Sequence, residues 1–141
     1  MILLDTNIVS EVYKPRPDAL VVNWIDAQPR DLLYLCTPVL AEMYFGIELL
    51  DEGDRKNRLR ASIERLQNEL YRDRILVFDV LSAIEYGQIA ASRRKSGQRI
   101  NQVDGLIAAI ARANGATLAT RNSRHFVDLG LNVIDPFDVK S

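Results

Sequence analysis

Short apolar runs alternate with longer stretches of helical periodicity along this chain. Runs dominated by apolar residues lie at residues 2–4, 32–36, 75–78, 116–120 and 132–134. Runs of three to five such residues are typical of short strands that helices cover on both faces. They predict about five buried strands.

Between these runs, apolar residues recur every three or four positions, which is the spacing of an amphipathic helix. The predicted helices cover residues 5–14, 18–28, 37–50, 55–71, 81–94 and 102–113. Asp18 is expected to cap the second helix, and Thr37 to cap the third with Pro38 at its first helical position. Strands that alternate with helices predict an α/β fold with a central parallel sheet, and no linker divides residues 1–141 into two domains.

Composition narrows the class of protein. Hydrophobic residues make up 48% and charged residues 26%, so a single globular domain is expected. No apolar run approaches the roughly 18 residues of a membrane span, and the N-terminus has no basic region typical of a signal peptide. One cysteine, Cys36, excludes an internal disulfide, and one histidine, His125, excludes most histidine-rich metal sites. We therefore expect a cytoplasmic protein with no membrane partner.

The net charge of −1 gives no overall attraction to nucleic acid. A polyanionic partner would have to be held by local basic patches or by metal ions.

Candidate chemistry lies where strands end, because open parallel sheets bind ligands beyond the carboxyl ends of their strands. Polar residues follow the predicted strands, and two acids stand one turn into helices that start at the same edge. These residues are Asp5, Thr37, Asp79, Asn122, Asp135, Glu42 and Asp104.

Each of these residues also has a purely structural interpretation. Asp5 can cap a helix, Asp104 can form a capping pair with Asn101, and Asn122 suits any turn. Glu42 lies among apolar residues and can simply reach solvent at the edge of its helix face. If it is buried, a lone carboxylate costs several kcal/mol unless it is paired or bound to a metal.

Taken together, Asp5, Glu42 and Asp104 come from three separate βα connections. Carboxylates gathered at one edge repel each other unless a cation is bound or their pKa values rise. An all-oxygen donor set selects Mg²⁺ or Mn²⁺, the usual ions of phosphoryl chemistry.

Four motifs in this order resemble those of PIN-domain ribonucleases, most closely the VapC and FitB type of toxin from type II toxin–antitoxin pairs. The matching segments are residues 2–7 (ILLDTN), 37–46 (TPVLAEMYFG), 103–109 (VDGLIAA), 116–122 (ATLATRN) with 125–126, and the ending 133–137 (VIDPF). The resemblance covers nearly the whole chain and implies a single PIN-like domain.

The resemblance also implies roles for individual residues. Asp5 and Asp104 would hold the metal directly, and Glu42 would complete the acidic pocket as a ligand or through a water. Asn122 stands where many relatives carry a fourth acid, so a second metal ion is left open. The remaining implied site residues are substrate-binding: Thr6, Asn7 and Thr120. The basic residues Arg93 and Arg94 are further candidates for substrate binding, because their charge can hold RNA phosphates.

Arg93 and Arg94 have an alternative role, because basic residues at the end of a helix also complement its dipole.

The implied reaction is Mg²⁺-dependent hydrolysis of RNA, with Mn²⁺ as a substitute, leaving a 5′-phosphate and a 3′-hydroxyl. The implied partner is a cognate VapB/FitA-like antitoxin whose C-terminal segment covers the active site. An acidic pocket built for a cation also suits an arginine, so we expect the antitoxin to insert one there. We also expect a homodimer, and a larger hetero-oligomer with the antitoxin. This complex would contact operator DNA only through the antitoxin.

Three other hypotheses fit the alternation of strands and helices. A haloacid-dehalogenase-like phosphatase needs a second aspartate two positions after Asp5, where this chain has Asn7. A receiver-like regulatory module needs paired acids after the first strand and a lysine after a late strand, where this chain has Arg121. A catalytically weak or inactive PIN-fold binding module is the third, and Asn122 is the residue that favours it.

Overall fold

A five-stranded parallel sheet forms the centre of the molecule in the computed structural model, which describes residues 1–138. The last three residues of the predicted domain, 139–141, lie outside the described residues. The strands are β1 (Ile2–Leu4), β2 (Leu33–Cys36), β3 (Ile75–Leu76), β4 (Thr117–Ala119) and β5 (Val133–Ile134). They lie in the order β3-β2-β1-β4-β5, with every neighbouring pair parallel. The predicted α/β fold with about five short strands is confirmed.

The chain reverses its direction across the sheet at β1. From β1 it builds outward to β2 and β3, then crosses back to place β4 on the other side of β1. A reversal of this kind opens a crevice at the carboxyl ends of the two strands, which is the usual ligand site in such sheets. The order also differs from the 2-1-3-4-5 order of receiver-like folds.

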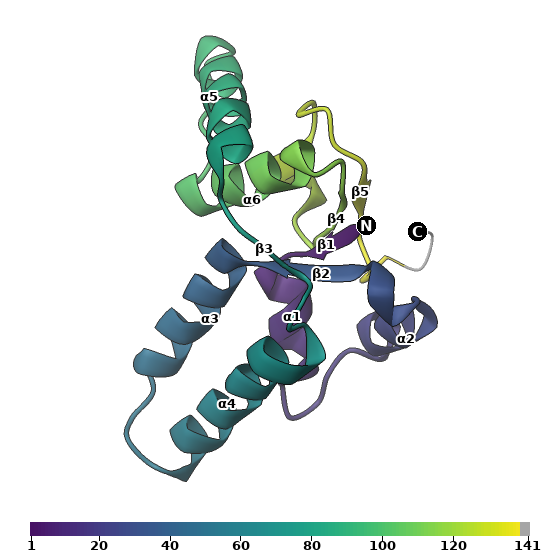
Figure 1. Cartoon of the computed structure of the whole chain (residues 1–141), viewed down its shortest axis with the longest axis vertical. Coiled ribbons are helices and arrows are strands. Elements are labelled where there is room, and N and C mark those ends of the chain that lie inside the picture. Colours follow the sequence, from purple (N-terminus) through teal and green to yellow (C-terminus); the bar gives the residue numbers. More distant parts are fainter. Residues whose placement is uncertain (139–141) are drawn as a thin grey trace.

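Helices cover both faces of the sheet. They are α1 (Thr6–Val12), α2 (Ala19–Ala27), α3 (Thr37–Glu48), α4 (Asp54–Arg65), α5 (Val80–Lys95) and α6 (Gln102–Ala113). In Figure 1, α5 and α6 lie on one side of the sheet, and α1, α3 and α4 on the other. Thus α1, α3 and α4, which precede β3 in the chain, lie on one face of the sheet. The two helices between β3 and β4, α5 and α6, lie on the other face.

The core consists of the strands and the helix faces that cover them. Leu3, Leu35 and Leu118 of the three central strands are fully buried, as are Ile107 and Ile110 of α6. Full burial of an aliphatic side chain contributes about 1.5–3 kcal/mol. These contacts fix α6 firmly against the sheet.

Helix α6 also packs closely on α5. A Cβ atom at Gly105 would lie 2.9 Å from the Cε2 atom of Tyr86, a ring that α5 supplies. Since any side chain would collide with this ring, glycine directly after Asp104 sets how near the two helices approach.

Several predicted boundaries need correction. Thr37 is the first helical residue of α3 and not its cap, because the extended residue at the boundary is Cys36. The predicted helix over 55–71 leaves α-helical geometry after Arg65 and continues as a π-turn, η2 (Leu66–Leu70). Asp18 caps α2 as predicted, accepting a hydrogen bond from the Leu20 amide at 2.8 Å. None of the helices within residues 1–138 combines the length and apolar character that a membrane crossing requires.

Candidate active site

Asp5 lies in the crevice between β1 and β4 and is only 4% exposed. One carboxylate oxygen accepts a hydrogen bond from the Thr6 amide at 2.7 Å, which caps α1. The other accepts from the Thr120 hydroxyl at 2.7 Å and from the Asn7 amide group at 3.3 Å. Thr120 follows β4, so this carboxylate joins the two strands where the chain reverses direction.

The pKa of Asp5 is raised above its ordinary value, chiefly by burial. The hydrogen bonds from Thr120 and Thr6 oppose this rise, and the negative charges of Asp104 and Glu42 add to it. The three acids are thus electrostatically coupled. Such coupling makes a bound cation favourable at this position.

Glu42 lies in the second turn of α3 and is exposed. Its carboxylate accepts a 2.5 Å hydrogen bond from the Thr6 hydroxyl, while the Thr6 amide donates to Asp5. Thr6 therefore connects two of the three acids. The nearby Cys36 thiol is buried, and burial raises its pKa to about 12, so it stays protonated and is no candidate nucleophile.

Asp104 lies in the first turn of α6, on the opposite helical layer from Glu42. Asn101 caps this helix, and its side chain accepts from the amides of Val103 at 2.9 Å and Asp104 at 3.4 Å. The Asp104 carboxylate lies 3.2 Å from Nδ1 of His125. Sequence reasoning missed this partner, because the two residues come from separate elements that meet only in the folded chain.

Asp104 and Glu42 both interact electrostatically with Asp5, yet their carboxylates contact different neighbours. Glu42 is hydrogen-bonded to Thr6, and Asp104 to His125. Across residues 1–138, no three side chains among His, Cys, Asp and Glu are grouped closely enough to hold one metal ion. Their predicted role as metal ligands stays a prediction.

The polar residues around Asp5 form a network that ties β1 to β4. Asn7 accepts a hydrogen bond from the Arg121 amide at 3.1 Å, and Thr120 accepts one from the Asn122 amide at 3.1 Å. Thr120 is fully buried, and its hydroxyl holds the Asp5 carboxylate in position. The Asn122 side chain is exposed and makes no hydrogen bond within the described part of the chain.

The two arginines predicted for substrate binding differ in their surroundings. The Arg93 guanidinium donates to the carbonyls of His125 at 3.1 Å and Val127 at 2.7 Å, so it anchors the loop after β4. Arg94 is exposed, with no ion pair to any residue that the structure describes.

The remaining strand-end acids lie away from Asp5. Asp79 follows β3 and caps α5 by accepting from the Ser82 amide at 2.9 Å and its hydroxyl at 2.8 Å. Asp135 follows β5 and accepts from the Phe137 amide at 2.9 Å. Because β3 and β5 are the edge strands of the sheet, these acids follow its two edges, whereas Asp5 follows the central strand β1.

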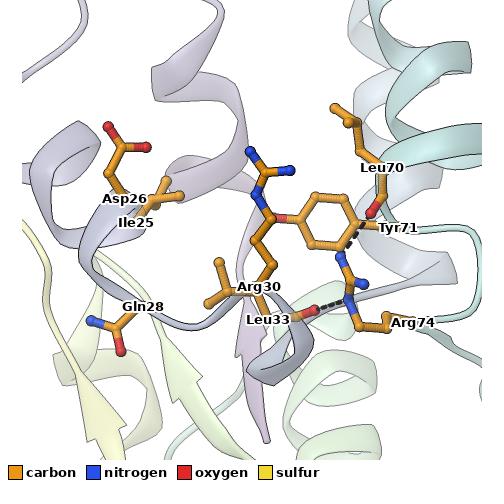
Figure 2. Close-up of a pocket in the computed structure, with 8 residues that line it drawn as sticks. All are labelled: Ile25, Asp26, Gln28, Arg30, Leu33, Leu70, Tyr71 and Arg74. Carbon is orange, nitrogen blue, oxygen red and sulfur yellow. Dashed lines mark hydrogen bonds between the residues drawn. The ribbon is translucent and has the colours of Figure 1, made fainter.

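A pocket of about 400 Å³ lies at the opposite edge of the sheet (Figure 2). Arg74 lines one side of it, where its guanidinium donates to the carbonyls of Leu33 at 2.9 Å and Leu70 at 2.7 Å. The same group lies 5.0 Å from the centre of the Tyr71 ring. Leu33 begins β2 and Arg74 directly precedes β3, so this pocket is at the amino ends of the strands. It belongs to a different surface from the acids.

Comparison with known proteins gives matches along nearly the whole chain. The family model described as PIN domain matches residues 2–130. The plasmid stability protein StbB of Pseudomonas syringae pv. tomato is 43% identical over 138 residues, which are 98% of this chain and 99% of the relative. The VapC ribonuclease Y4jK of Sinorhizobium fredii is 38% identical over 98% of this chain and 99% of its own. A solved structure of FitAB bound to an IR36 DNA fragment aligns with a TM-score of 0.93 and 38% identity, covering 100% of this chain and 99% of the other.

Proposed function

Because the chain belongs to the PIN-domain family, we propose that it is a metal-dependent endoribonuclease and the toxin of a type II toxin–antitoxin pair. Relatives named as ribonucleases and as the toxin FitB, aligned over nearly their full length, support this proposal. Neither the haloacid-dehalogenase-like nor the receiver-like hypothesis gains support from the matches.

The observation that carries the proposal is the buried Asp5 carboxylate at the reversal between β1 and β4. Its pKa is raised by burial and further by Asp104 and Glu42. An enzyme that neutralises phosphate charge with a cation needs such a preformed negative centre at the ligand-binding edge of its sheet.

A divalent cation suits this set of donors, because every candidate ligand is a carboxylate oxygen and hard cations prefer oxygen. Asp5, Asp104 and Glu42 would hold it, with Mg²⁺ as the proposed ion and Mn²⁺ as a substitute. When bound, the ion would neutralise charge on the phosphate and lower the pKa of a water molecule.

The chain's own polar groups position these acids. The Thr120 hydroxyl and the Thr6 amide hold the two oxygens of Asp5 in a fixed orientation. The Thr6 hydroxyl holds Glu42, and His125 holds Asp104. Water addition at phosphorus would then release the 3′-oxygen and leave a 5′-phosphate.

One observation favours a second candidate, a PIN fold that binds partners without cleavage. Across residues 1–138 no three acidic, His or Cys side chains are spaced for one ion, and the Asn122 amide adds no charge. An inactive chain would still fold and bind an antitoxin, so a cleavage assay separates the two candidates.

The proposed protein partner is an antitoxin of the VapB/FitA type. Solved complexes named FitAB and VapBC, each aligned over nearly all of this chain, support it. An apolar hollow of about 150 Å³ between α1, α2 and the π-turn offers a place for an apolar antitoxin segment. Its lining residues include Val9, Val12, Ile25 and Leu66. The amphipathic residues 38–50 and 55–71, which fold as α3 and as α4 with the π-turn, would supply a further apolar groove for the same partner.

A homodimer is also proposed, with a surface formed by exposed apolar side chains around the start of α5. Val77, Val80, Leu81 and Ile84 are each more than half exposed, which is unusual for such large apolar groups near one another. Operator DNA would be reached only through the antitoxin, in line with the DNA-bound FitAB relative.

The test combines a cleavage assay with expression in a bacterial host. The purified chain should cut RNA with Mn²⁺ present, Asp5→Asn should not, and Asp51→Asn, an exposed acid far from the crevice, should match wild type. Expression of the wild-type chain should arrest growth, and co-expression of the neighbouring small gene should restore it. A harmless chain that cuts no RNA would replace the nuclease with the inactive binding module.

A further inference from the structure

A cleft of about 510 Å³ is lined by Asp104, one of the three acids, and by its partner His125. Arg99 and Arg124 also line it. A second hollow of about 390 Å³ shares Arg93 and Arg124 with it and extends the depression away from Asp104. We name the two hollows together the arginine cleft.

One wall of the arginine cleft is the short connection between α5 and α6. After Lys95 the chain turns back through Gly97, whose φ of +74° favours glycine. The amide of Gln98 donates to the Arg93 carbonyl at 2.9 Å, which closes the end of α5. Arg99 therefore projects from a tight, hydrogen-bonded turn.

The opposite wall is the short helix η3 (Ser123–Phe126), which follows β4. Phe126 is buried and fixes η3 to the core, while Arg124 and His125 are exposed. Arg93 spans the two walls, because its guanidinium donates to the carbonyls of His125 and Val127. It is a positioning residue that sets the spacing of the walls.

Two guanidinium groups in the arginine cleft have unused donors. Arg99 and Arg124 form no ion pair and no hydrogen bond with any of residues 1–138, although Asp104 and Asp128 also line the cleft. A planar guanidinium whose five donors are unsatisfied is well suited to a phosphate group.

We propose that the arginine cleft binds single-stranded RNA and that Arg99 and Arg124 hold the phosphate next to the scissile one. This inference rests on the proposed nuclease function, since the scissile phosphate would lie at Asp5, Glu42 and Asp104. A chain with a net charge of −1 has little general attraction for RNA, so local donors of this kind must supply it. A single strand fits because its backbone can enter a narrow depression with the bases turned outward.

The experiment measures binding of a labelled 12-nucleotide RNA of random sequence by fluorescence anisotropy, in EDTA so that no cleavage occurs. Arg99→Gln and Arg124→Gln should each weaken binding about tenfold, since a charge-assisted hydrogen bond is lost. Each should also reduce the slope of log K against log salt by about 0.7. Arg58→Gln removes the same charge from the exposed side of α4 and should leave both quantities unchanged.

Cleavage with Mn²⁺ is measured in parallel, so that the two proposals fail separately. If the wild type binds RNA through Arg99 and Arg124 yet never cuts, the nuclease proposal fails and RNA binding by the cleft stands. If the wild type cuts while both variants bind and cut like Arg58→Gln, the arginine cleft is not an RNA site. If the two variants lose antitoxin binding while their RNA affinity is unchanged, the arginine cleft is a protein-docking surface. If the wild type binds duplex RNA more tightly than single-stranded RNA, the single-strand assignment is wrong.

Discussion

Thr120 offers a direct test of how the Asp5 carboxylate is held. The substitution Thr120→Val keeps the shape of the side chain and removes its hydroxyl. That hydroxyl is fully buried, donates to Asp5 at 2.7 Å and accepts from the Asn122 amide at 3.1 Å. The valine variant would lose both of these bonds and the longer one, of 3.5 Å, that the hydroxyl accepts from the Asn7 side chain, and a buried polar group that loses its partner destabilises the fold.

The cost follows from these two contacts. A hydrogen bond to a charged group contributes about 1.5–3 kcal/mol, and the Asn122 amide loses an acceptor worth about 1 kcal/mol. We expect Thr120→Val to lower the free energy of unfolding by about 2–4 kcal/mol. Thr120→Ser keeps the hydroxyl and loses one methyl group, so it should cost only about 1 kcal/mol.

The cost should also depend on pH. Because the pKa of Asp5 is raised above 3.8, the folded chain holds this proton to higher pH than the unfolded chain does. Ionisation of Asp5 therefore lowers stability as pH rises from 3.8 through the folded pKa, and the penalty is absent below 3.8. The Thr120 hydrogen bond reduces this penalty. Its loss should cost more at pH 7 than at pH 4.

Urea unfolding of the metal-free chain at both pH values measures these differences. Equal stability of the valine and serine variants at pH 7 would refute the argument. So would a valine penalty that does not change between pH 4 and pH 7.

Further predictions concern the other site residues and the ion. Asp104→Asn removes a negative charge that repels the Asp5 carboxylate, so the metal-free variant should melt at the wild-type temperature or above it. RNA cleavage should fall at least about 100-fold. Full cleavage by this variant would exclude Asp104 from the mechanism. EDTA should abolish cleavage, and Mg²⁺ or Mn²⁺ should restore it better than Zn²⁺, since the chain has one histidine and one buried cysteine; equal rescue by Zn²⁺ in the same assay would contradict the all-oxygen site. Asn122→Asp should tighten Mn²⁺ binding measured by calorimetry, and unchanged or weaker affinity would place Asn122 outside the site.

Local sequence patterns predicted most helices and strands, because apolar spacing and capping residues indicate the same element at those positions. Residues 102–113 follow the capping residue Asn101 and have apolar residues at helical spacing, and α6 has these bounds. Agreement fails at residues 66–70, where helical spacing continues but the chain adopts a π-turn. The apolar spacing does not reveal this change, since Leu66 and Leu70 continue the helical repeat although Leu66 is buried and Leu70 is 40% exposed.

The candidate site was only partly predictable for a related reason. Each acid could be found at a strand or helix end, because those positions follow from local pattern. The partners of the acids could not, since Thr120 and His125 approach Asp5 and Asp104 only after β4 inserts beside β1. The role of Arg93 was equally hidden, because its acceptors are backbone carbonyls more than thirty positions away.

The insertion of β4 beside β1 also has a consequence during protein synthesis. Asp5 leaves the ribosome early, but the hydroxyl that orients it is 115 residues further along the chain. At roughly 5–20 residues per second, about 6 to 23 s separate the synthesis of the two. Throughout that interval the nascent polypeptide lacks β4, the strand that lies beside β1 and carries Thr120 at its end. Any activity of this chain therefore begins only after translation is nearly finished.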